Sequence, residues 1–277
     1  MIACSTVKKC DIRSHYNLST LFYRLLWGRH IHHGLWTADE SPAVAQQQLT
    51  ETLAHEAGIL RHDRVLDVGC GMGGSSVYLA KQLGCVVTGI TISPLQRRWA
   101  QSTACLQRLP KRATFLCADA EQVTFPPASF DVVWNVECTE HLFDKPAFFR
   151  RSAQWLRPGG RVAICAWLAG DRTDANAVQQ VHDVCEGFFC PSLGTQHDYA
   201  QWMQQAGFKI CACHDCTTSV TITWEICRDR VRKFGMHWLA RAVDRNSVMF
   251  LDRFTTILEA YQTGAMKYGC FVAERAT

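Results

Sequence analysis

Two carboxyl groups and one imidazole follow a short apolar run in the middle of the chain, at Glu137, Glu140 and His141. These side chains can move protons, since an imidazole titrates near neutral pH and a carboxyl group removed from water can also act as a base. A base so placed could take a proton from a phenol, or from a carbon that has just formed a new bond. All three are therefore candidate catalytic residues. The alternative is that one of the carboxylates only caps the next helix or binds its own loop.

A glycine-rich segment follows another apolar run, at 64–68. Gly69 and Gly71 lack the Cβ that would keep a ligand away from the backbone. Asp67 can accept hydrogen bonds from an amine or from the amides of the loop. In open parallel sheets a ligand lies beyond the carboxyl ends of the strands, where this loop is expected. Together with Gly74 the glycines also satisfy the dinucleotide pattern G-x-G-x-x-G, so they leave the identity of the ligand open.

The elements that position these residues are short apolar runs that alternate with helical stretches. The expected strands lie at 64–68, 85–90, 113–118, 130–136, 161–167, 208–213 and 268–272. The expected helices lie at 51–60, 75–83, 93–108, 144–156 and 198–207. This alternation predicts an α/β fold with a parallel sheet, right-handed crossovers and helices on both faces. We expect a turn at 158–160 and a mostly helical cap at 220–264.

The segment at 65–74, VLDVGCGMGG, resembles the first motif of class I S-adenosylmethionine-dependent methyltransferases. In that family the loop holds the methionine part of the cofactor. The resemblance therefore implies cofactor contacts from Asp67, Gly69, Cys70 and Gly71. It also implies a Rossmann-like sheet of seven mostly parallel strands with helices on both faces and a helical cap.

Later segments resemble the tocopherol C-methyltransferase branch of that family. The sequence GITISPLQ at 89–96 is similar to its ribose-side segment, which implies cofactor contacts from Thr91 and Gln96. The acid that usually ends this strand is absent, as it is in this branch. Asp119 and Ala120 resemble the adenine-contacting pair, in which the carboxylate accepts from the exocyclic amine.

Two more segments resemble the same branch: ECTEHL at 137–142 resembles its fourth-strand motif, and KYG at 267–269 its last strand. Its N-terminal cap segment is similar in Tyr16, Asn17, Ser19, Tyr23, Trp27, Gly28, His30, His33 and Gly34. Aromatic faces favour a positive sulfonium, so Tyr16 is expected to close over the cofactor. The expected substrate-binding residues are Tyr23, Trp27, His30 and His33. For the two tyrosines the alternative is packing of the first helix.

The resemblance implies methyl transfer to a small, largely apolar natural product, with C-methylation of a prenylated or aromatic compound favoured. N- or O-methylation of an alkaloid or phenol, and C-methylation of a prenyl diphosphate, remain alternatives. A nicotinamide-dependent oxidoreductase and an inactive cofactor-binding regulatory partner are the rival classes. The expected division is a helical cap segment at 1–60, a cofactor-binding core at 61–215, a cap insertion at 216–265 and a final strand at 266–277.

The composition excludes several other classes of protein. The 277 residues are 48% hydrophobic with a net charge of +4, and no apolar stretch approaches the ~18 residues of a membrane helix. The mild charge disfavours nucleic acid as a partner. The 15 cysteines and an N-terminus without an apolar signal core predict reduced thiols and a cytoplasmic protein. We expect no metal site, because neither the histidines near His30 nor the cysteines near Cys213 have a second ligand pair at metal-binding spacing.

Overall fold

The computed structural model describes residues 1–26, 28, 30–233 and 245–276. Seven strands form one sheet in the order β4-β3-β2-β5-β6-β9-β8. These strands are β2 (Arg64–Val68), β3 (Val86–Thr91), β4 (Ala113–Cys117), β5 (Phe130–Val136), β6 (Leu156–Ala169), β8 (Phe208–Asp215) and β9 (Met266–Arg275). The first five are parallel, and β9 runs antiparallel to both β6 and β8. This confirms the expected mostly parallel seven-stranded sheet.

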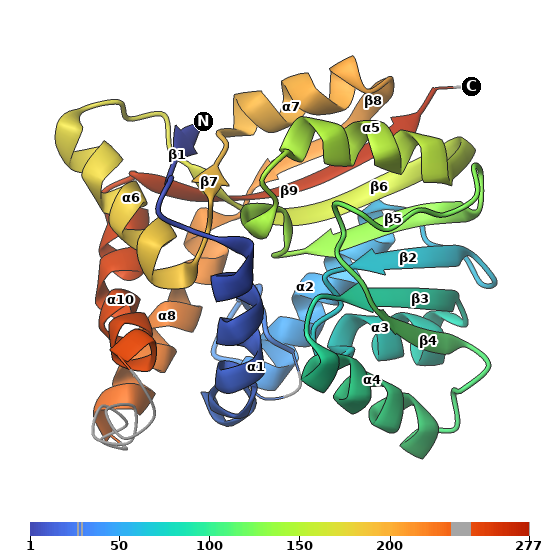
Figure 1. Cartoon of the computed structure of the whole chain (residues 1–277), viewed down its shortest axis with the longest axis horizontal. Coiled ribbons are helices and arrows are strands. Elements are labelled where there is room, and N and C mark those ends of the chain that lie inside the picture. The colour runs from blue at the N-terminus through green and yellow to red at the C-terminus, as the bar shows by residue number, and fades with distance from the viewer. Residues whose placement is uncertain (27, 29, 234–244, 277) are drawn as a thin grey trace.

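Helices cover both faces of the sheet (Figure 1). They are α1 (Lys9–Leu26), α2 (Pro42–Glu56), α3 (Gly74–Tyr78), α4 (Pro94–Leu106), α5 (Lys145–Trp155), α6 (Ala175–Phe188), α7 (Gln196–Gln205), α8 (Thr217–Lys233) and α10 (Arg245–Gln262). Successive strand residues point to opposite faces, and the core divides accordingly. Val65 packs with one cluster, which includes Leu49 of α2, while Leu66 packs with the other, which includes Phe149 of α5.

A helical cap lies at one end of the sheet, where Figure 1 shows α1, α6, α8 and α10 grouped together. The cap expected at 220–264 corresponds to most of α8 together with α10. Helix α6 was not predicted, although Asp174 caps it by accepting a hydrogen bond from the backbone of Ala177. A two-stranded ladder of β1 (Ile2–Ala3) and β7 (Ser192–Leu193) joins the N-terminus to the segment that follows α6.

The turn expected at 158–160 lies inside a strand. β6 already begins at Leu156, which pairs with Phe130 of β5. Arg161 then pairs with Val132, so the intervening residues form an irregularity in a ladder that continues past them. Gly159 accommodates this bend because its φ of +71° costs a glycine little. The prediction of a turn that separates helix from strand was therefore wrong.

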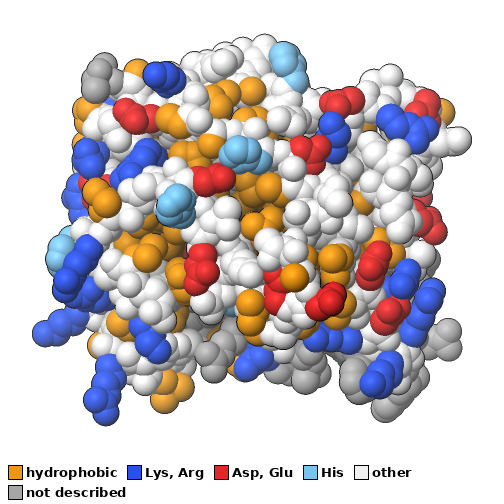
Figure 2. Space-filling view, turned by 180° about the vertical axis from the view of Figure 1, so that it is seen from behind, with side chains coloured by type: hydrophobic (Ala, Val, Ile, Leu, Met, Phe, Trp, Pro, Cys, Tyr) orange, Lys and Arg blue, Asp and Glu red, His pale blue; other side chains and the backbone are white. Residues whose placement is uncertain are grey.

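The surface of the described residues carries charges of both signs, and Figure 2 shows them mixed on the face seen from behind. The last turn of α8 holds Arg230, Arg232 and Lys233, where cations are favoured by the helix dipole. None of the helices that the structure describes is long and apolar enough to cross a membrane.

The core makes one prediction about stability. Leu49 of α2 is 1% exposed, whereas Leu106 at the end of α4 is 86% exposed. Leu49→Ala should lower the free energy of unfolding by about 2–5 kcal/mol, because it removes buried methyl groups and leaves a cavity. Leu106→Ala, the matched control, should change it by less than about 0.5 kcal/mol. Urea unfolding followed by circular dichroism measures both values, and equal values would contradict this packing.

Candidate functional site

Three cavities adjoin at the carboxyl ends of the parallel strands. We call the first the edge cavity: it has a volume of about 740 Å³ and extends past Gly69, Thr91 and Asp119. The aromatic cavity, of about 430 Å³, lies under the cap. The glycine-loop cavity, of about 350 Å³, lies between the loop after β2 and the segment around Ile31. Ile31 lines all three, so the three cavities converge on this side chain.

The loop after β2 passes so close to the loop after β5 that there is no space for a side chain at position 69. Gly69 has a φ of +80°, and a Cβ at this position would lie 2.3 Å from the Cβ of Cys138. The amides of Gly69 and Cys70 both donate to the carbonyl oxygen of Ile90 at 2.9 Å, which fixes the bend. Gly71 has a φ of +52° and lines both the edge cavity and the glycine-loop cavity.

Asp67 lies beneath this loop and is 2% exposed. Its carboxylate accepts a hydrogen bond from the hydroxyl of Ser76. Burial raises the pKa of Asp67 to about 7, although this hydrogen bond lowers it. The carboxyl group also lines the glycine-loop cavity, where a ligand amine would favour its charged form.

The far end of the edge cavity is polar. Thr91 donates to Oε1 of Gln96 at 3.0 Å, but within the described part of the chain the buried Nε2 of Gln96 has no hydrogen-bond partner. Because Gln96 lines the edge cavity, a ligand bound there can supply the acceptor for this donor. Ala120 lines the same end, and the carboxylate of Asp119 accepts from Lys9 of α1 at 2.8 Å.

His141 and Tyr16 form a hydrogen-bonded pair between the edge cavity and the aromatic cavity. Nδ1 of His141 lies 3.1 Å from the carbonyl oxygen of Phe189, which can only accept, so Nδ1 carries the hydrogen. Nε2 then holds a lone pair and accepts from the Tyr16 hydroxyl at 2.7 Å. Burial lowers the pKa of His141 to about 4, so the ring is a neutral base at pH 7.

Glu137 lines the edge cavity and the aromatic cavity. Its carboxylate accepts hydrogen bonds from other residues of the protein. Its Oε1 accepts from the backbone amide of His33 at 2.8 Å, from Nδ1 of His33 at 2.9 Å and from the hydroxyl of Tyr268 at 2.8 Å. Its Oε2 accepts from Nε1 of Trp167 at 3.0 Å. Burial alone would raise the pKa of Glu137, but the hydrogen bonds from the ring and the backbone amide of His33 lower it below its usual range.

Glu140 is the second carboxyl group of the aromatic cavity and differs from Glu137 in its proton affinity. It is 1% exposed and accepts a hydrogen bond from the backbone amide of Trp167. Burial raises the pKa of Glu140 to about 8. Near pH 7 one carboxyl group of the cavity is therefore charged and the other mostly neutral. A pair of acids separated in this way is typical of sites that assign different roles to each.

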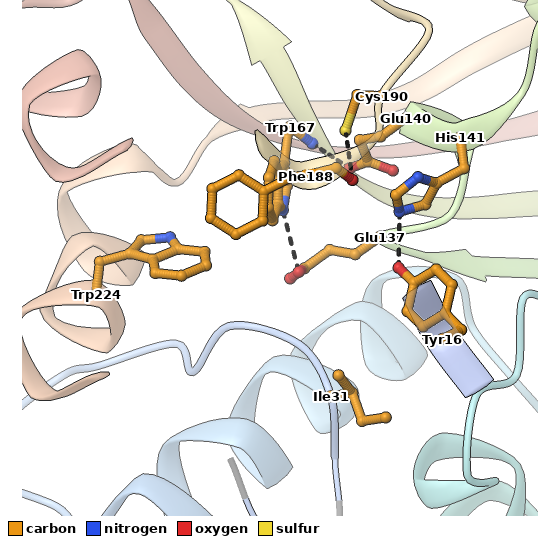
Figure 3. Close-up of a pocket in the computed structure, with 9 residues that line it drawn as sticks. All are labelled: Tyr16, Ile31, Glu137, Glu140, His141, Trp167, Phe188, Cys190 and Trp224. Carbon is orange, nitrogen blue, oxygen red and sulfur yellow. Dashed lines mark hydrogen bonds between the residues drawn. The ribbon is translucent and has the colours of Figure 1, made fainter. Parts of the chain in front are cut away.

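The opposite wall of the aromatic cavity is made of rings. Figure 3 shows Trp167, Phe188 and Trp224 on the side away from His141 and Tyr16. The rings of Trp167 and Trp224 meet edge to face with centroids 5.7 Å apart. A flat, apolar molecule would fit against this wall with its reactive atom toward His141.

The predicted substrate-binding residues do not share one place. His33 is 1% exposed and lies behind Glu137, outside the lining of the aromatic cavity. His30 lines the glycine-loop cavity instead, where its Nδ1 lies 3.0 Å from Nε2 of His32. Neither ring lines the aromatic cavity, and the assignment of His30 and His33 to the substrate stays a prediction. Trp27 and the side chain of Tyr23 lie outside the described residues.

The sequence analysis did not identify the three rings on the far wall of the aromatic cavity. Trp167 lies near the end of a predicted strand, a position that could have indicated it. Phe188 ends the helix that was not predicted, and Trp224 lies inside the predicted cap. Within the described residues no group of three or more His, Cys, Asp or Glu side chains is arranged to hold a metal ion.

Comparisons with known proteins agree with this geometry. Residues 66–164 match a family model described as a methyltransferase domain. The chloroplastic tocopherol O-methyltransferase of Arabidopsis thaliana is 30% identical, over 95% of this chain and 81% of that protein. The 27-O-demethylrifamycin SV methyltransferase of Amycolatopsis mediterranei (strain S699) is 34% identical, over 86% and 88%.

Solved structures show the same fold. Geranyl diphosphate C-methyltransferase from Streptomyces coelicolor A3(2) has a TM-score of 0.76 at 21% identity, over 96% of this chain and 97% of that one. The [4+2]-cyclase SpnF has a TM-score of 0.85 at 21% identity, over 96% and 95%. Since one neighbour is named a methyltransferase and the other a cyclase, the fold alone does not fix the reaction.

Proposed function

Because this chain belongs to the class I S-adenosylmethionine-dependent methyltransferases and is related to the tocopherol methyltransferases, we propose that it methylates a carbon atom of a small, largely apolar natural product. Its cofactor, S-adenosylmethionine, supplies a methyl group already activated on a positive sulfur. The protein therefore has to align a nucleophile, exclude water and receive a proton. A prenylated or aromatic compound is the proposed acceptor.

The edge cavity and the glycine-loop cavity fit the cofactor. Gly71, where a Cβ would meet only Ile31 at 3.9 Å, leaves room for the methionine part, and Gly69 and Cys70 line the same loop. We assign Asp67 to the methionine amine. The remaining proposed cofactor contacts are Tyr16, Thr91, Gln96, Asp119 and Ala120, all of which line the edge cavity.

One observation carries the proposal: the edge cavity and the aromatic cavity share Tyr16, Ile31, Glu137 and His141. A molecule in each cavity would meet its neighbour at these side chains, with the Nε2 lone pair of His141 at the junction. His141 is proposed to receive a proton by way of Tyr16: the Tyr16 hydroxyl takes the proton that the acceptor loses and passes its own hydrogen to Nε2 of His141. The aromatic wall orients the acceptor and keeps water out.

The test is incubation of the protein with cofactor labelled in its methyl group and a panel of phenols, indoles, amines and isoprenoids. The proposal expects the label on a carbon atom of an apolar aromatic or prenylated acceptor. Label on nitrogen or oxygen alone would overturn C-methylation while retaining methyl transfer. Binding of S-adenosylhomocysteine without turnover of any acceptor would instead favour a regulatory partner. Preferential binding of a nicotinamide cofactor would favour an oxidoreductase.

Gln96 gives a sharper test of the cofactor site. Gln96→Leu should weaken S-adenosylhomocysteine binding by roughly tenfold, because about 1.4 kcal/mol is lost with one buried hydrogen bond to the ligand. Gln48→Leu is the matched control, since Gln48 also has a buried amide atom without a hydrogen-bond partner in the described residues but lies outside the edge cavity. Calorimetry measures both affinities. Unchanged affinity in Gln96→Leu would remove this residue from the site.

The cellular compartment stays a prediction. Two tocopherol O-methyltransferase relatives are named as chloroplastic, which is said of those proteins alone. The division of the chain at residues 60, 215 and 265 also stays a prediction. Both can be examined independently of the reaction, by fractionation and by limited proteolysis.

A further inference from the structure

We propose that Glu137 acts as a fixed negative charge at the junction of the two cavities, and that the acceptor is a neutral nucleophile that becomes a cation when it is methylated. This inference rests on the proposed function and deepens it, because it selects among acceptors by charge. A neutral amine nitrogen or an electron-rich carbon meets the requirement. A phenolate or a phosphorylated prenyl chain does not.

The charge on Glu137 is fixed by its hydrogen bonds. Four N–H and O–H groups donate to one carboxylate, three of them to Oε1. A carboxylate that accepts two or three such bonds can have a pKa below ~2, so these donors are sufficient to keep it ionised. Protonating Glu137 would weaken these four bonds, because a neutral carboxyl group accepts hydrogen bonds less strongly than a carboxylate. Glu137 is thus poorly suited to act as a base.

The neighbouring His33 does not cancel this charge. Nε1 of Trp224 is 2.5 Å from Nε2 of His33, and an indole N–H can only donate. Nε2 must therefore hold a lone pair, and the ring is neutral with its hydrogen on Nδ1, which faces Glu137. In the part of the chain that the structure describes, no Lys or Arg forms an ion pair with Glu137 or lines the aromatic cavity.

The backbone at Glu137 adds a second, independent sign of function. Its φ is +53°, a left-handed conformation that non-glycine residues rarely adopt. Such a conformation persists only where surrounding contacts impose it, and it is common at active sites. Here the contacts come from the segment at His33, from Trp167 of β6 and from Tyr268 of β9. Three distant parts of the chain therefore hold one carboxylate between the cavities.

Charge conservation links this carboxylate to the acceptor. When a methyl group leaves a sulfonium, the C–S bond breaks and sulfur keeps the electron pair, so sulfur becomes neutral. The new bond uses an electron pair of the acceptor, and a neutral acceptor gains the positive charge until it loses a proton to a base such as His141. The charge thus moves from one side of Glu137 to the other, and a carboxylate near both positions stabilises it throughout.

The aromatic wall favours the same product. Trp167 and Trp224 present ring systems to the cavity, and the faces of such rings attract cations. A phenolate would instead place its negative charge beside the ionised Glu137, and a diphosphate would place more than one there. Like charges in a buried site are strongly unfavourable.

The test compares two probes of the same shape, phenyltrimethylammonium and tert-butylbenzene, by calorimetry in saturating S-adenosylhomocysteine. The wild-type protein should bind the cation at least roughly tenfold more tightly than the neutral isostere, which corresponds to about 1.4 kcal/mol. Glu137→Gln should lower this preference at least roughly threefold and leave only the part that the aromatic wall contributes. Glu140→Gln is the matched control: it exchanges one mostly neutral group for another in the same cavity, so the preference should remain.

Each outcome decides the inference. Equal affinities for the two probes in the wild-type protein, or a preference of unchanged size in Glu137→Gln, would overturn it. If Glu137→Gln does not fold, the test is a crystal structure of the wild-type protein with S-adenosylhomocysteine and phenyltrimethylammonium. An ammonium group more than about 6 Å from the Glu137 carboxylate would contradict the inference. Failure of the wild-type protein to bind S-adenosylhomocysteine would overturn the proposed function itself.

Discussion

Gly69→Ala should weaken the binding of S-adenosylhomocysteine by at least about 100-fold, or roughly 2.7 kcal/mol. Gly69 occupies a positive-φ conformation, and an added Cβ would lie 2.3 Å from the Cβ and 2.4 Å from the sulfur of Cys138. Neither contact can relax without moving the loop after β2 or the loop after β5. Both loops border the edge cavity, so the cofactor site must deform. Calorimetric titration measures the effect.

A matched control separates the clash from the cost of the backbone conformation. Gly207 also has a positive φ, +86°, but a Cβ there would have no neighbour within 4 Å. Gly207→Ala should cost some stability, about 1 kcal/mol, and leave the affinity for S-adenosylhomocysteine unchanged. An equal loss of affinity in both variants would show that the result comes from global destabilisation and not from the steric clash at Gly69.

His141→Ala should lower turnover by about 10²–10⁴-fold, the usual contribution of a positioned general base. The affinity for S-adenosylhomocysteine should stay within about threefold, because His141 only borders the edge cavity. His197→Ala, which removes an exposed histidine from α7, should change neither quantity. Full turnover in His141→Ala would remove this residue from the mechanism.

The pH dependence of turnover provides a second check on His141. Because burial lowers its pKa to about 4, the ring is in its neutral, proton-accepting form at every pH above about 5. Protonation of His141 should therefore reduce turnover only as the pH falls toward 4. The profile is measured at saturating cofactor, where the ligand amine keeps Asp67 charged. A loss of activity centred near pH 6.5 under these conditions would contradict the buried environment described for the His141 ring.

The sequence predicted those features of the fold and the site that depend on the local spacing of residues. The period of apolar residues predicted 130–136 as a strand, and β5 spans Phe130–Val136. Strand ends in a parallel sheet meet at one edge, so Gly69, Asp119 and Glu137 could be expected to lie close together, and the edge cavity extends past all three. Helix α6 could also have been predicted from Asp174 and the apolar period that follows it.

What the sequence could not show is how distant segments meet. Nothing in the spacing of His33, Trp167 and Tyr268 indicates that all three donate to one carboxylate, because their convergence depends on packing between the cap and the sheet. The same packing gives the carboxylate of Glu137 four hydrogen-bond donors, which its place in the sequence does not indicate. For a similar reason the sequence could not show that the rings of His30 and His33 lie outside the lining of the aromatic cavity.

A crystal structure of the protein with S-adenosylhomocysteine tests the central claim most directly. We expect the methionine part of the ligand to lie against Gly69 and Gly71, and its adenine to lie near Asp119. The sulfur should lie close to Ile31, where the three cavities meet. The sulfur should face the aromatic cavity between Glu137 and His141. Density for the ligand elsewhere on the molecule, or an edge cavity filled by side chains in crystals soaked at saturating concentration, would contradict it.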